Sequence, residues 1–411
     1  MTDCWLPYGE TEVYVTVELE NLIKTLEPSG RGEATQFTSA LIASLDEPIG
    51  GETLGNLVKP GCRVAIAVDG SMNPHYAAQA VSALVKQLIE LIVPSDRITV
   101  ILGNCERENG GGRLHESLLK EPALSQVKVL NHLRATAGTE EVGVTHGGTT
   151  IEVNRDYIEA TLRIAVGETR VDPLYGFSGA HNAVVPGASS QRTLAESRRR
   201  YFKGNVAPGI IELNPLKEDA VEAARLAGID FAVNIPVDPT GVYMGVYSGA
   251  FEETWGKAIT ALGGAYEVKA DTLADITVVS AGGEQYDFNL YKASWALENA
   301  ARATKRNGSV IMLAECRDGL GAEAFTRLSR VTETSEFERR YTTGAEALQM
   351  VKRVTGNLRV ILVSALPRYL IEPLGLESAR TANQAYELAA SGRRARSTFV
   401  IPHGCTVKVI V

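Results

Sequence analysis

Residues 63–68 read Arg-Val-Ala-Ile-Ala-Val, a short apolar run that ends at Asp69-Gly70. Its β-branched residues predict a buried strand, and the 3.6-residue periodicity of residues 77–92 predicts a helix after the loop. A second run of the same kind covers residues 97–102. Strand, loop, helix and strand in repetition is typical of parallel sheets with helices on both faces.

The same alternation continues along the chain, and a second series of strands and helices begins near residue 270. We expect further strands at 127–130, 164–166, 231–235, 276–280, 309–314 and 358–363, and helices at 219–226 and 290–304. The fold class is therefore α/β, with two domains of parallel or mixed sheets flanked by helices. Ligands bind beyond the carboxyl ends of such strands, so we search the loops that begin at Asp69, Gly103, Gly167 and Asn234.

A chain of 411 residues is too long for one ordinary core and fits two domains. The closing segment, 397–411, reads as two short strands separated by Pro402–Gly404. Because a terminal β segment needs an edge to pair with, we expect it to return to the first domain. This gives an N-terminal α/β domain of residues 1–267 plus 396–411, and a C-terminal α/β domain of residues 268–395.

The composition limits the classes of partner. A formal net charge of −8 argues against a general nucleic-acid binder, which needs a concentrated basic surface. The short basic run 198–200 with Lys203 is expected to be a solvated helix face. No apolar stretch has the length of a membrane span, and the first ten residues lack the apolar region of a signal peptide. The five cysteines are scattered and odd in number, which indicates a cytoplasmic setting.

Small residues are concentrated in Gly176-Phe177-Ser178-Gly179-Ala180, just beyond an expected strand. Such a segment allows a ligand to approach the backbone closely, or it forms a tight turn that has only a structural role. The spacing is that of neither a dinucleotide-binding fingerprint nor a phosphate-binding loop. The segment by itself therefore leaves both interpretations open, and Ser178 and Gly179 are the residues that would contact a ligand.

In its context, however, this segment resembles the central signature of the nickel-pincer lactate racemase family. Motifs similar to those of that family occur in order along most of the chain. They are Leu6–Gly9, Val68-Asp69 with Pro74, Gly148–Arg155, Ile164–Gly167, Gly176–Gly179, Pro186-Gly187, Asn214-Pro215, Ala223–Gly228, Asn289–Tyr291, Ala314–Cys316 and Asp318–Gly321.

The resemblance implies two α/β domains with the site in the cleft between them. It also implies a tethered nickel-pincer cofactor and the racemisation or epimerisation of 2-hydroxy acids by hydride transfer. The position of the family's tethering lysine holds Asn182, whose amide cannot form that covalent link. The position of the nickel-ligating histidine holds Arg198, whose guanidinium stays protonated and has no lone pair for a metal. We therefore predict that the tethered cofactor is absent, and we assign no metal ligands.

Other positions that the resemblance implies are also replaced. Cys105 and Asp172 stand where the family has its two acid/base histidines, and Asn73 stands at the substrate-binding arginine. Lys292 and Trp295 take the places of a glutamine and a lysine on a helix of the second domain. Being three residues apart, they would share one helix face, either as an anion site beside an aromatic wall or as a snorkelling lysine beside a packed indole.

His181, which neighbours the tether position, is a candidate general base or an ordinary loop histidine. Asp172 is a second acid/base candidate, although Asp172-Pro173 is also a common start of a turn. Cys105 is a candidate nucleophile or a structural thiol. Arg198 and Lys292 would hold the substrate anion, with Asn73 and Asn182 as further binding residues.

The leading hypothesis is an isomerase-type enzyme that acts on a small 2-hydroxy acid or related anion by proton abstraction. One alternative is a non-catalytic protein that binds a small anion or a nucleotide on the same scaffold. Another is a racemase or epimerase that holds the nickel-pincer cofactor non-covalently. We expect a small anionic molecule as partner, no nucleic acid and no membrane, and we leave open whether the chain forms a homo-oligomer.

Overall fold

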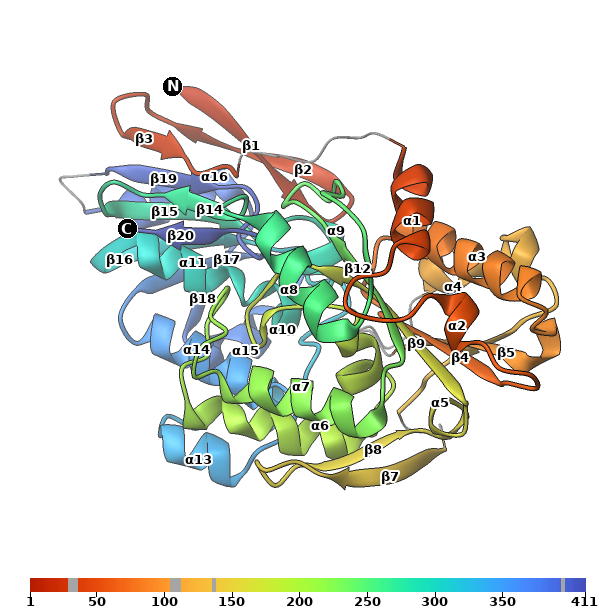
Figure 1. Cartoon of the computed structure of the whole chain (residues 1–411). Helices are drawn as coiled ribbons and strands as arrows, with labels where there is room; N and C mark the ends of the chain where they lie inside the picture. Colours follow the sequence, from red (N-terminus) through yellow and green to blue (C-terminus); the bar gives the residue numbers. More distant parts are fainter. Residues whose placement is uncertain (29–35, 104–111, 135–137, 393–395) are drawn as a thin grey trace. The chain divides into compact units, whose positions relative to one another are not determined.

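The computed structural model describes residues 1–28, 36–103, 112–134, 138–392 and 396–411. The chain divides into two compact units, one formed by residues 1–29 with 266–411 and the other by residues 30–265. Each unit is built on a six-stranded sheet with helices beside it (Figure 1). The expected α/β fold with two main sheets is therefore confirmed.

The sheet of the unit formed by residues 30–265 has the order β13-β12-β9-β4-β5-β6, and its pairs are parallel except for β12 with β13. The chain runs from β4 to β5 and β6 on one side, and later from β9 to β12 on the other. The topological switch point therefore lies between β4 and β9. The strands are β4 (Val64–Val68), β5 (Ile98–Leu102), β6 (Lys128–Asn131), β9 (Leu162–Thr169), β12 (Phe231–Pro236) and β13 (Tyr247–Gly249).

Both faces of this sheet are buried, as the continuous apolar runs predict. In β4, Val64, Ile66 and Val68 join a core cluster with α1 and α3, whereas Ala65 and Ala67 join a second cluster on the opposite face with α5 and α7. The small alanine side chains on that face let the covering segments pack close to the strand. The helices are α1 (Phe37–Asp46), α3 (Pro74–Glu90), α5 (Arg155–Ile158) and α7 (Pro215–Ala227).

The sheet of the other unit has the order β18-β17-β16-β15-β19-β3, and all its pairs are parallel. The hairpin β1–β2 and helix α16 pack on one face. Helices α11 and α14 contact β15, β16 and β17 as well. The elements are β1 (Thr2–Tyr8), β2 (Thr11–Val17), β3 (Leu22–Thr25), β15 (Ala274–Ser280), α11 (Ala296–Ala303), β16 (Thr304–Leu313), α14 (Ala345–Thr355), β17 (Arg359–Val363), β18 (Leu376–Ala379), α16 (Ala382–Ala390) and β19 (Thr398–Ile401).

The closing segment forms the two expected strands, but it does not return to the unit of residues 30–265. Strand β19 is inserted between β15 and β3, and β20 (Lys408–Ile410) pairs with β14 (Glu267–Lys269). All four residues of β19 are buried, so the strand is interior to the sheet and not added at its edge. The expected grouping of 396–411 with 1–267 is therefore replaced by a unit that joins both ends of the chain to residues 266–395.

The helix expected at 290–304 is interrupted. It consists of α10 (Leu290–Ala293) and α11, with Ser294 and Trp295 between them. The Ser294 hydroxyl donates to the carbonyl oxygen of Tyr291 at 2.9 Å, and the Cys405 sulfur lies 3.7 Å from the carbonyl oxygens of Lys292 and Ala293. These contacts give helix carbonyls partners other than the next turn of the helix.

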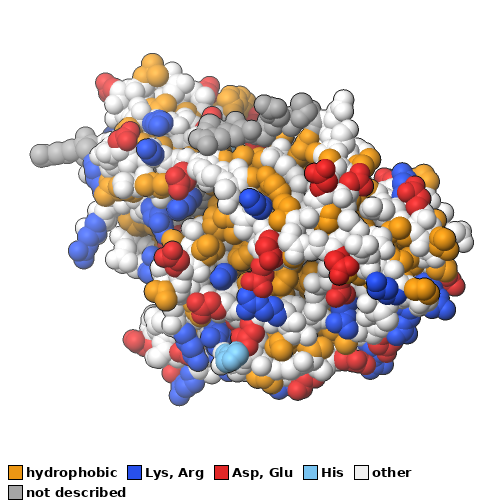
Figure 2. All heavy atoms as spheres, viewed as in Figure 1, with side chains coloured by type: hydrophobic (Ala, Val, Ile, Leu, Met, Phe, Trp, Pro, Cys, Tyr) orange, Lys and Arg blue, Asp and Glu red, His pale blue; other side chains and the backbone are white. Residues whose placement is uncertain are grey.

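The surface in Figure 2 carries interspersed acidic and basic side chains, with no extended patch of one sign on the face shown. Among the residues that the structure describes, no helix is both long and apolar enough to cross a membrane. The four cysteines in the described part of the chain form no disulfide bond.

Candidate functional site

Strands β4 and β9 end side by side at the switch point, and polar residues follow both. The Asp69 N–H donates to the carbonyl oxygen of Val166 at 3.0 Å, which extends the pairing by one residue. Asp69 Oδ1 accepts from the N–H of Ser71 at 2.9 Å and from its hydroxyl at 2.8 Å. The loop after β4, one of those selected from the sequence, is thus fixed at its first turn.

A buried ion pair stands at the end of β9. The Glu168 side chain is 2% exposed and pairs with the guanidinium of Arg170, which is 15% exposed. Glu168 Oε1 also accepts the Asn73 N–H at 2.8 Å, and Arg170 Nη2 donates to the carbonyl oxygen of Ser71 at 3.5 Å. We call Asp69, Ser71, Asn73, Glu168 and Arg170 the switch-point cluster.

Sequence reasoning selected the loop after Gly167 but did not single out Glu168 or Arg170. Their position in the sequence could have indicated them, because charged residues at the carboxyl end of a buried parallel strand lie at the ligand-binding edge of the sheet. Asn73 was predicted to bind substrate. In the structure its side chain caps α3, with Oδ1 accepting the N–H of His75 at 2.9 Å.

The Ser178 side chain connects the Gly-Phe-Ser-Gly turn to β9. Its hydroxyl donates to the carbonyl oxygen of Glu168 at 2.9 Å and accepts the Arg170 N–H at 3.1 Å. The Ser178 N–H donates to the carbonyl oxygen of Arg170 at 2.9 Å. The turn therefore holds the backbone on both sides of the ion pair.

The second half of the turn packs against β12 and α8 (Phe251–Leu262). Asn234 Oδ1 accepts the Ala180 N–H at 2.8 Å, and the indole of Trp255 donates to the carbonyl oxygen of Ser178 at 2.9 Å. A Cβ atom at Gly179 would lie 2.6 Å from Trp255 Cδ1, and one at Gly167 would lie 2.7 Å from Ala180 Cα. The two glycines thus allow Trp255 and Ala180 to pack closely against the backbone, which favours the interpretation of the turn as structural.

Asn182 is built into the same turn. Its Oδ1 accepts the N–H of Gly179 at 2.8 Å, and its side chain is largely buried. The carboxamide therefore stabilises the backbone of the turn at the position where the family resemblance places a tethering lysine.

His181 lies in an aromatic, water-excluded environment. Its ring centroid is 4.7 Å from that of Trp255 and 6.3 Å from that of Phe251, and the residue is 1% exposed. Neither ring nitrogen has a hydrogen-bond partner among the described residues. Burial, reinforced by the charge of Lys217, lowers the pKa of His181 to about 3. The ring is thus neutral near pH 7, and in this arrangement it cannot donate a proton as an imidazolium.

Asp172 lies on the hairpin that carries the turn. Strand β10 (Val171–Asp172) pairs with β11 (Gly176–Phe177), and Asp172 Oδ1 accepts the N–H groups of Leu174 and Tyr175, both at 2.8 Å. This is the turn geometry that the Asp-Pro sequence predicts. One oxygen of the carboxylate is therefore used to shape the loop, two residues beyond Arg170.

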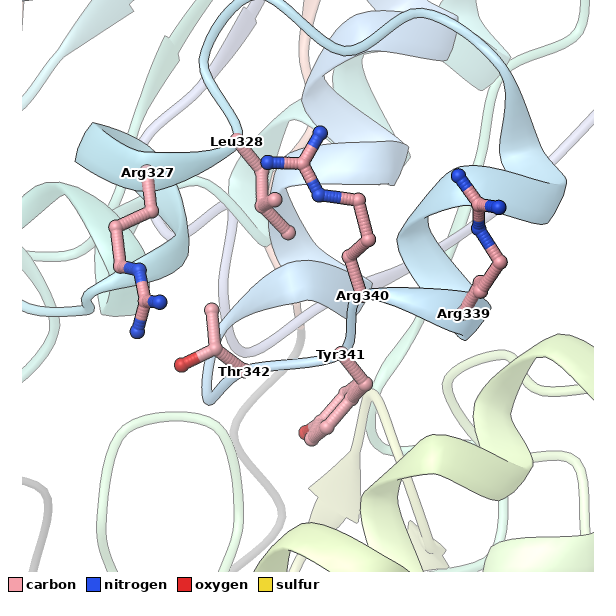
Figure 3. Close-up of a pocket in the computed structure, with 6 residues that line it drawn as sticks. All are labelled: Arg327, Leu328, Arg339, Arg340, Tyr341 and Thr342. Carbon is pink, nitrogen blue, oxygen red and sulfur yellow. The ribbon is translucent and has the colours of Figure 1, made fainter.

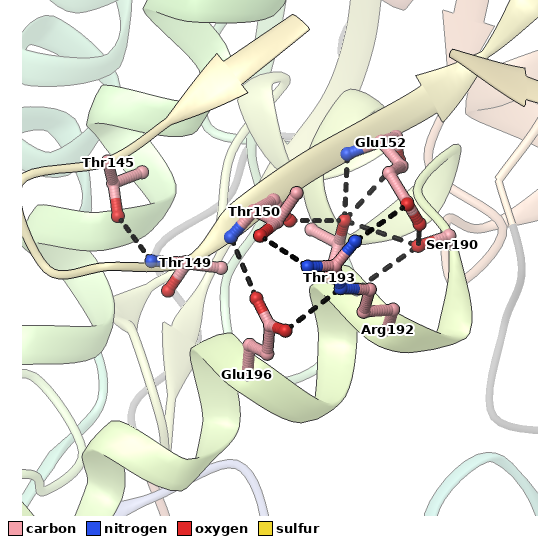
Figure 4. A network of polar contacts seen from close by, with 8 residues as sticks. All are labelled: Thr145, Thr149, Thr150, Glu152, Ser190, Arg192, Thr193 and Glu196. Atoms are coloured by element: carbon pink, nitrogen blue, oxygen red, sulfur yellow. Dashed lines mark hydrogen bonds and ion pairs between the residues drawn. The ribbon is translucent and has the colours of Figure 1, made fainter. Parts of the chain in front are cut away.

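Helix α6 (Gln191–Arg198) carries Arg198 in its last turn and is anchored to β8 (Thr150–Asn154) by a polar network (Figure 4). Thr193 Oγ1 donates to the carbonyl oxygen of Thr150 at 2.8 Å, and Glu196 accepts the Thr150 N–H at 2.8 Å. Arg198 is only 5% exposed, whereas Arg199 is exposed. The expected solvated face is therefore wrong for Arg198, because α6 packs this residue inward.

The remaining predicted residues belong to the other unit or lie outside the described residues. Lys292 is half-buried in α10, and Trp295 is buried at the break before α11. Cys405, whose sulfur lies beside the Lys292 carbonyl, has its pKa raised to about 12 by burial, although the nearby Lys292 charge lowers it. Cys105 falls within residues 104–111, outside the described part of the chain.

A doubly wound sheet with a charged cluster at its switch point is the arrangement in which α/β proteins generally bind ligands, beyond the carboxyl ends of the strands. The models of the lactate racemase N-terminal domain and of the lactate racemase C-terminal domain match residues 8–207 and 269–411. The chain belongs to the lactate racemase family.

Two lactate racemases are similar over almost their whole length. That of Thermoanaerobacterium thermosaccharolyticum is 24% identical over 424 residues, covering 100% of this chain and 99% of the relative. That of Lactiplantibacillus plantarum is 26% identical over 424 residues, covering 98% and 99%. The similarity to these two relatives thus extends along almost the entire chain.

Solved structures share the fold. The lactate racemase apoprotein from Thermoanaerobacterium thermosaccharolyticum superposes with a TM-score of 0.85 at 22% identity, with both chains covered completely. A Thermotoga maritima protein superposes with a TM-score of 0.66 at 13% identity, covering 93% of this chain and 100% of that one. At these identities the similarity establishes the fold and nothing further.

Proposed function

We propose that this lactate racemase-like protein is an isomerase-type enzyme acting on a small 2-hydroxy acid or a related anion. The observation that carries the proposal is the ion pair of Glu168 and Arg170 at the switch point. A guanidinium held in a fixed direction by a buried carboxylate suits the carboxylate group of a substrate. Arg198, which belongs to the same unit, is a further candidate for holding the anion.

The chemistry that we propose is proton transfer at C2 of the substrate. A base removes the C2 proton, the C–H electron pair is delocalised into the adjacent carboxylate, and a proton returned to the opposite face gives the other configuration. No electron acceptor is required. Asp172 is the acid/base candidate that we retain, because its carboxylate stands two residues beyond Arg170 on the hairpin that β9 leads into. Buried neutral His181 does not suit the complementary role of proton donor.

The tethered nickel-pincer cofactor implied by the family does not fit these residues. The carboxamide of Asn182 lacks a nucleophilic amine and is engaged by the Gly179 N–H. Arg198 has no lone pair for a metal. Within the described residues, no group of three histidine, cysteine, aspartate or glutamate side chains is arranged to hold a metal ion.

Isotope exchange in D2O tests the proposed reaction. The protein is incubated with single enantiomers of lactate and of other small 2-hydroxy acids, and the products are followed by chiral chromatography and proton NMR. Proton transfer predicts that the opposite enantiomer appears together with deuterium at C2. Interconversion with full retention of the C2 proton would overturn proton transfer, and stoichiometric nickel in the same protein would identify a non-covalently held cofactor as the cause.

Matched arginine variants locate the site. Arg170→Met is expected to reduce turnover at least about 100-fold, because a charge-assisted contact to the substrate is lost. Arg97→Met is the control, since Arg97 is exposed and directly precedes β5, at the opposite edge of the same sheet. Equal losses in the two variants would contradict a substrate site at the switch point.

The second candidate function is a non-catalytic binding protein for a small anion. It is favoured by the use of Asp172 Oδ1 in a turn and by the neutral, buried ring of His181, because both groups then have structural tasks. Thermal-shift screening with the same acids separates the two candidates. Saturable stabilisation that Arg170→Met abolishes, without conversion of any bound acid, would replace the enzyme by the binder.

A further inference from the structure

A hollow of about 360 Å³ lies in the unit that contains residues 266–411. It is formed by the segment between β16 and α14, which includes the short helices α12 (Ala324–Arg327) and α13 (Thr334–Arg339). Its volume is within the range of small-molecule sites in proteins. The lining residues are Arg327, Leu328, Arg339, Arg340, Tyr341 and Thr342.

Three of the six lining residues are arginines. In Figure 3, Arg327 and Arg339 stand on opposite sides, and Arg340 extends between them over Leu328. Leu328 is 2% exposed and provides an apolar floor. The lining thus combines concentrated positive charge with a small apolar surface.

The ion pairs that these arginines form within the protein are weak. Arg327 pairs with Glu323 at 2.7 Å and Arg339 pairs with Glu336 at 2.6 Å, but both guanidinium side chains are more than 60% exposed. Exposed pairs of this kind contribute little stability, and an arriving anion can compete for them. Arg340 has no ion pair among the described residues, so its guanidinium is available.

The frame of the hollow is anchored to the core. The Tyr341 hydroxyl donates to Glu346 Oε2 at 3.0 Å, and Glu346 is fully buried and also accepts from the Tyr291 hydroxyl at 3.0 Å. The Thr342 hydroxyl donates to Glu323, the partner of Arg327. The segment that presents Arg340, Tyr341 and Thr342 is therefore held in position before any ligand arrives.

We propose that this hollow binds the phosphoryl group of a small phosphorylated molecule. Guanidinium groups pair with phosphate oxygens in a bidentate manner, and a dianion competes with single carboxylates for Arg327 and Arg339 better than a monoanion does. Leu328 and the Tyr341 ring suit an organic substituent on the phosphate. This inference does not depend on the reaction proposed above.

Calorimetric titration of the full chain with pyrophosphate, at constant ionic strength set by chloride, tests the proposal. We expect saturable binding that Arg340→Met weakens about tenfold or more, since one charge-assisted contact is lost. Arg340→Lys, which retains the charge but not the bidentate geometry, is expected to weaken binding by a smaller factor. Arg330→Met is the matched control, because Arg330 is exposed and three residues from Arg327 but does not line the hollow.

Arg340 is exposed, so its variants are expected to fold, and unchanged circular dichroism and melting temperature verify this. Titration with citrate distinguishes phosphoryl from carboxylate recognition, and weaker binding of citrate is expected. Absence of saturable pyrophosphate binding, or an equal loss in Arg330→Met, would overturn the proposal. Tighter binding of citrate than of pyrophosphate would contradict the phosphoryl class.

Discussion

The indole N–H of Trp255 donates to the carbonyl oxygen of Ser178 at 2.9 Å, and this bond joins helix α8 to the Gly-Phe-Ser-Gly turn. The Ser178 hydroxyl in turn donates to the Glu168 carbonyl oxygen and accepts the Arg170 N–H. A side chain from a helix that begins at residue 251 thereby supports the charged pair at the end of β9. Through Ser178, helix α8 is therefore linked to the backbone of Glu168 and Arg170.

Trp255→Phe is expected to lower the free energy of unfolding by about 1–3 kcal/mol, because a buried carbonyl oxygen loses its donor and the smaller ring leaves a gap. Denaturant unfolding followed by circular dichroism measures the change. Trp5→Phe is the control: Trp5 is 58% exposed on β1, and a shift within about 0.5 kcal/mol is expected there. Equal effects of the two substitutions would show that the bond to Ser178 contributes nothing.

Two glycines, one packed against the Trp255 ring and one next to Trp255 in sequence, should respond in opposite ways to substitution by alanine.

 Gly179 lies against the Trp255 ring, and Gly256 follows Trp255 in α8. Gly179→Ala is expected to destabilise the fold by about 1–3 kcal/mol, because its Cβ would lie 2.6 Å from Trp255 Cδ1. A Cβ atom at Gly256 would have no heavy atom within 4 Å, and this position of the helix is exposed. Gly256→Ala is therefore expected to stabilise the fold by about 0.5–1 kcal/mol.

Melting temperatures of both glycine variants, measured beside the parent protein, check this pair of expectations. The two changes add the same methyl group, so a difference in sign isolates the effect of the close contact with the ring. If Gly179→Ala were as stable as the parent, the turn would not be packed as tightly as the structure places it.

The strands could be predicted from the sequence because they are buried on both faces and therefore read as continuous apolar runs. Residues 63–68 and 276–280 were recognised in this way as the cores of β4 and β15. The placement of β19 could not be predicted, because the sequence of a short buried strand does not indicate which strands it pairs with. The pairing with β15 and β3 depends on contacts between residues that are distant along the chain.

The sequence indicated which loops form the candidate site, but it did not indicate the roles of their side chains. Asn73 and Asp172 were predicted to contact substrate, yet the hydrogen bonds of both cap or shape the local backbone. Their capping bonds run to N–H groups two or three residues away, which is also what the residue types alone allow. Glu168 and Arg170 were not predicted, because their pairing only becomes visible once β9 is placed beside β4.

The intact mass of the chain tests the absence of a covalently attached cofactor. Protein purified from cells that produce the family's cofactor is expected to have the mass of the unmodified chain, 44.1 kDa, because the Asn182 amide cannot form the link. Electrospray mass spectrometry of the native and the denatured protein measures this. An adduct that survives denaturation and disappears in Asn182→Ala would contradict the expectation.

The buried imidazole of His181 predicts a specific acid sensitivity. Its pKa is about 3 in the folded protein, lowered by burial and then by Lys217, against an ordinary value of 6.5. The unfolded chain therefore binds a proton below pH 6.5 that the folded chain does not bind until about pH 3. Stability from this group is complete above pH 6.5 and is lost as the pH falls, by at most about 1.4 kcal/mol per pH unit.

His181→Phe removes the titrating group and keeps an aromatic ring against Trp255 and Phe251. The variant is expected to have a flatter dependence of the unfolding free energy on pH between 6.5 and 4. At pH 7 it should be at least as stable as the parent, because two buried nitrogens without partners among the described residues are removed. Denaturant unfolding at a series of pH values measures both effects, with His75→Asn at an exposed position of α3 as the control. Parallel curves for the parent and His181→Phe would mean that the His181 ring reaches water or a hydrogen-bond acceptor in solution, so that its imidazolium is stabilised.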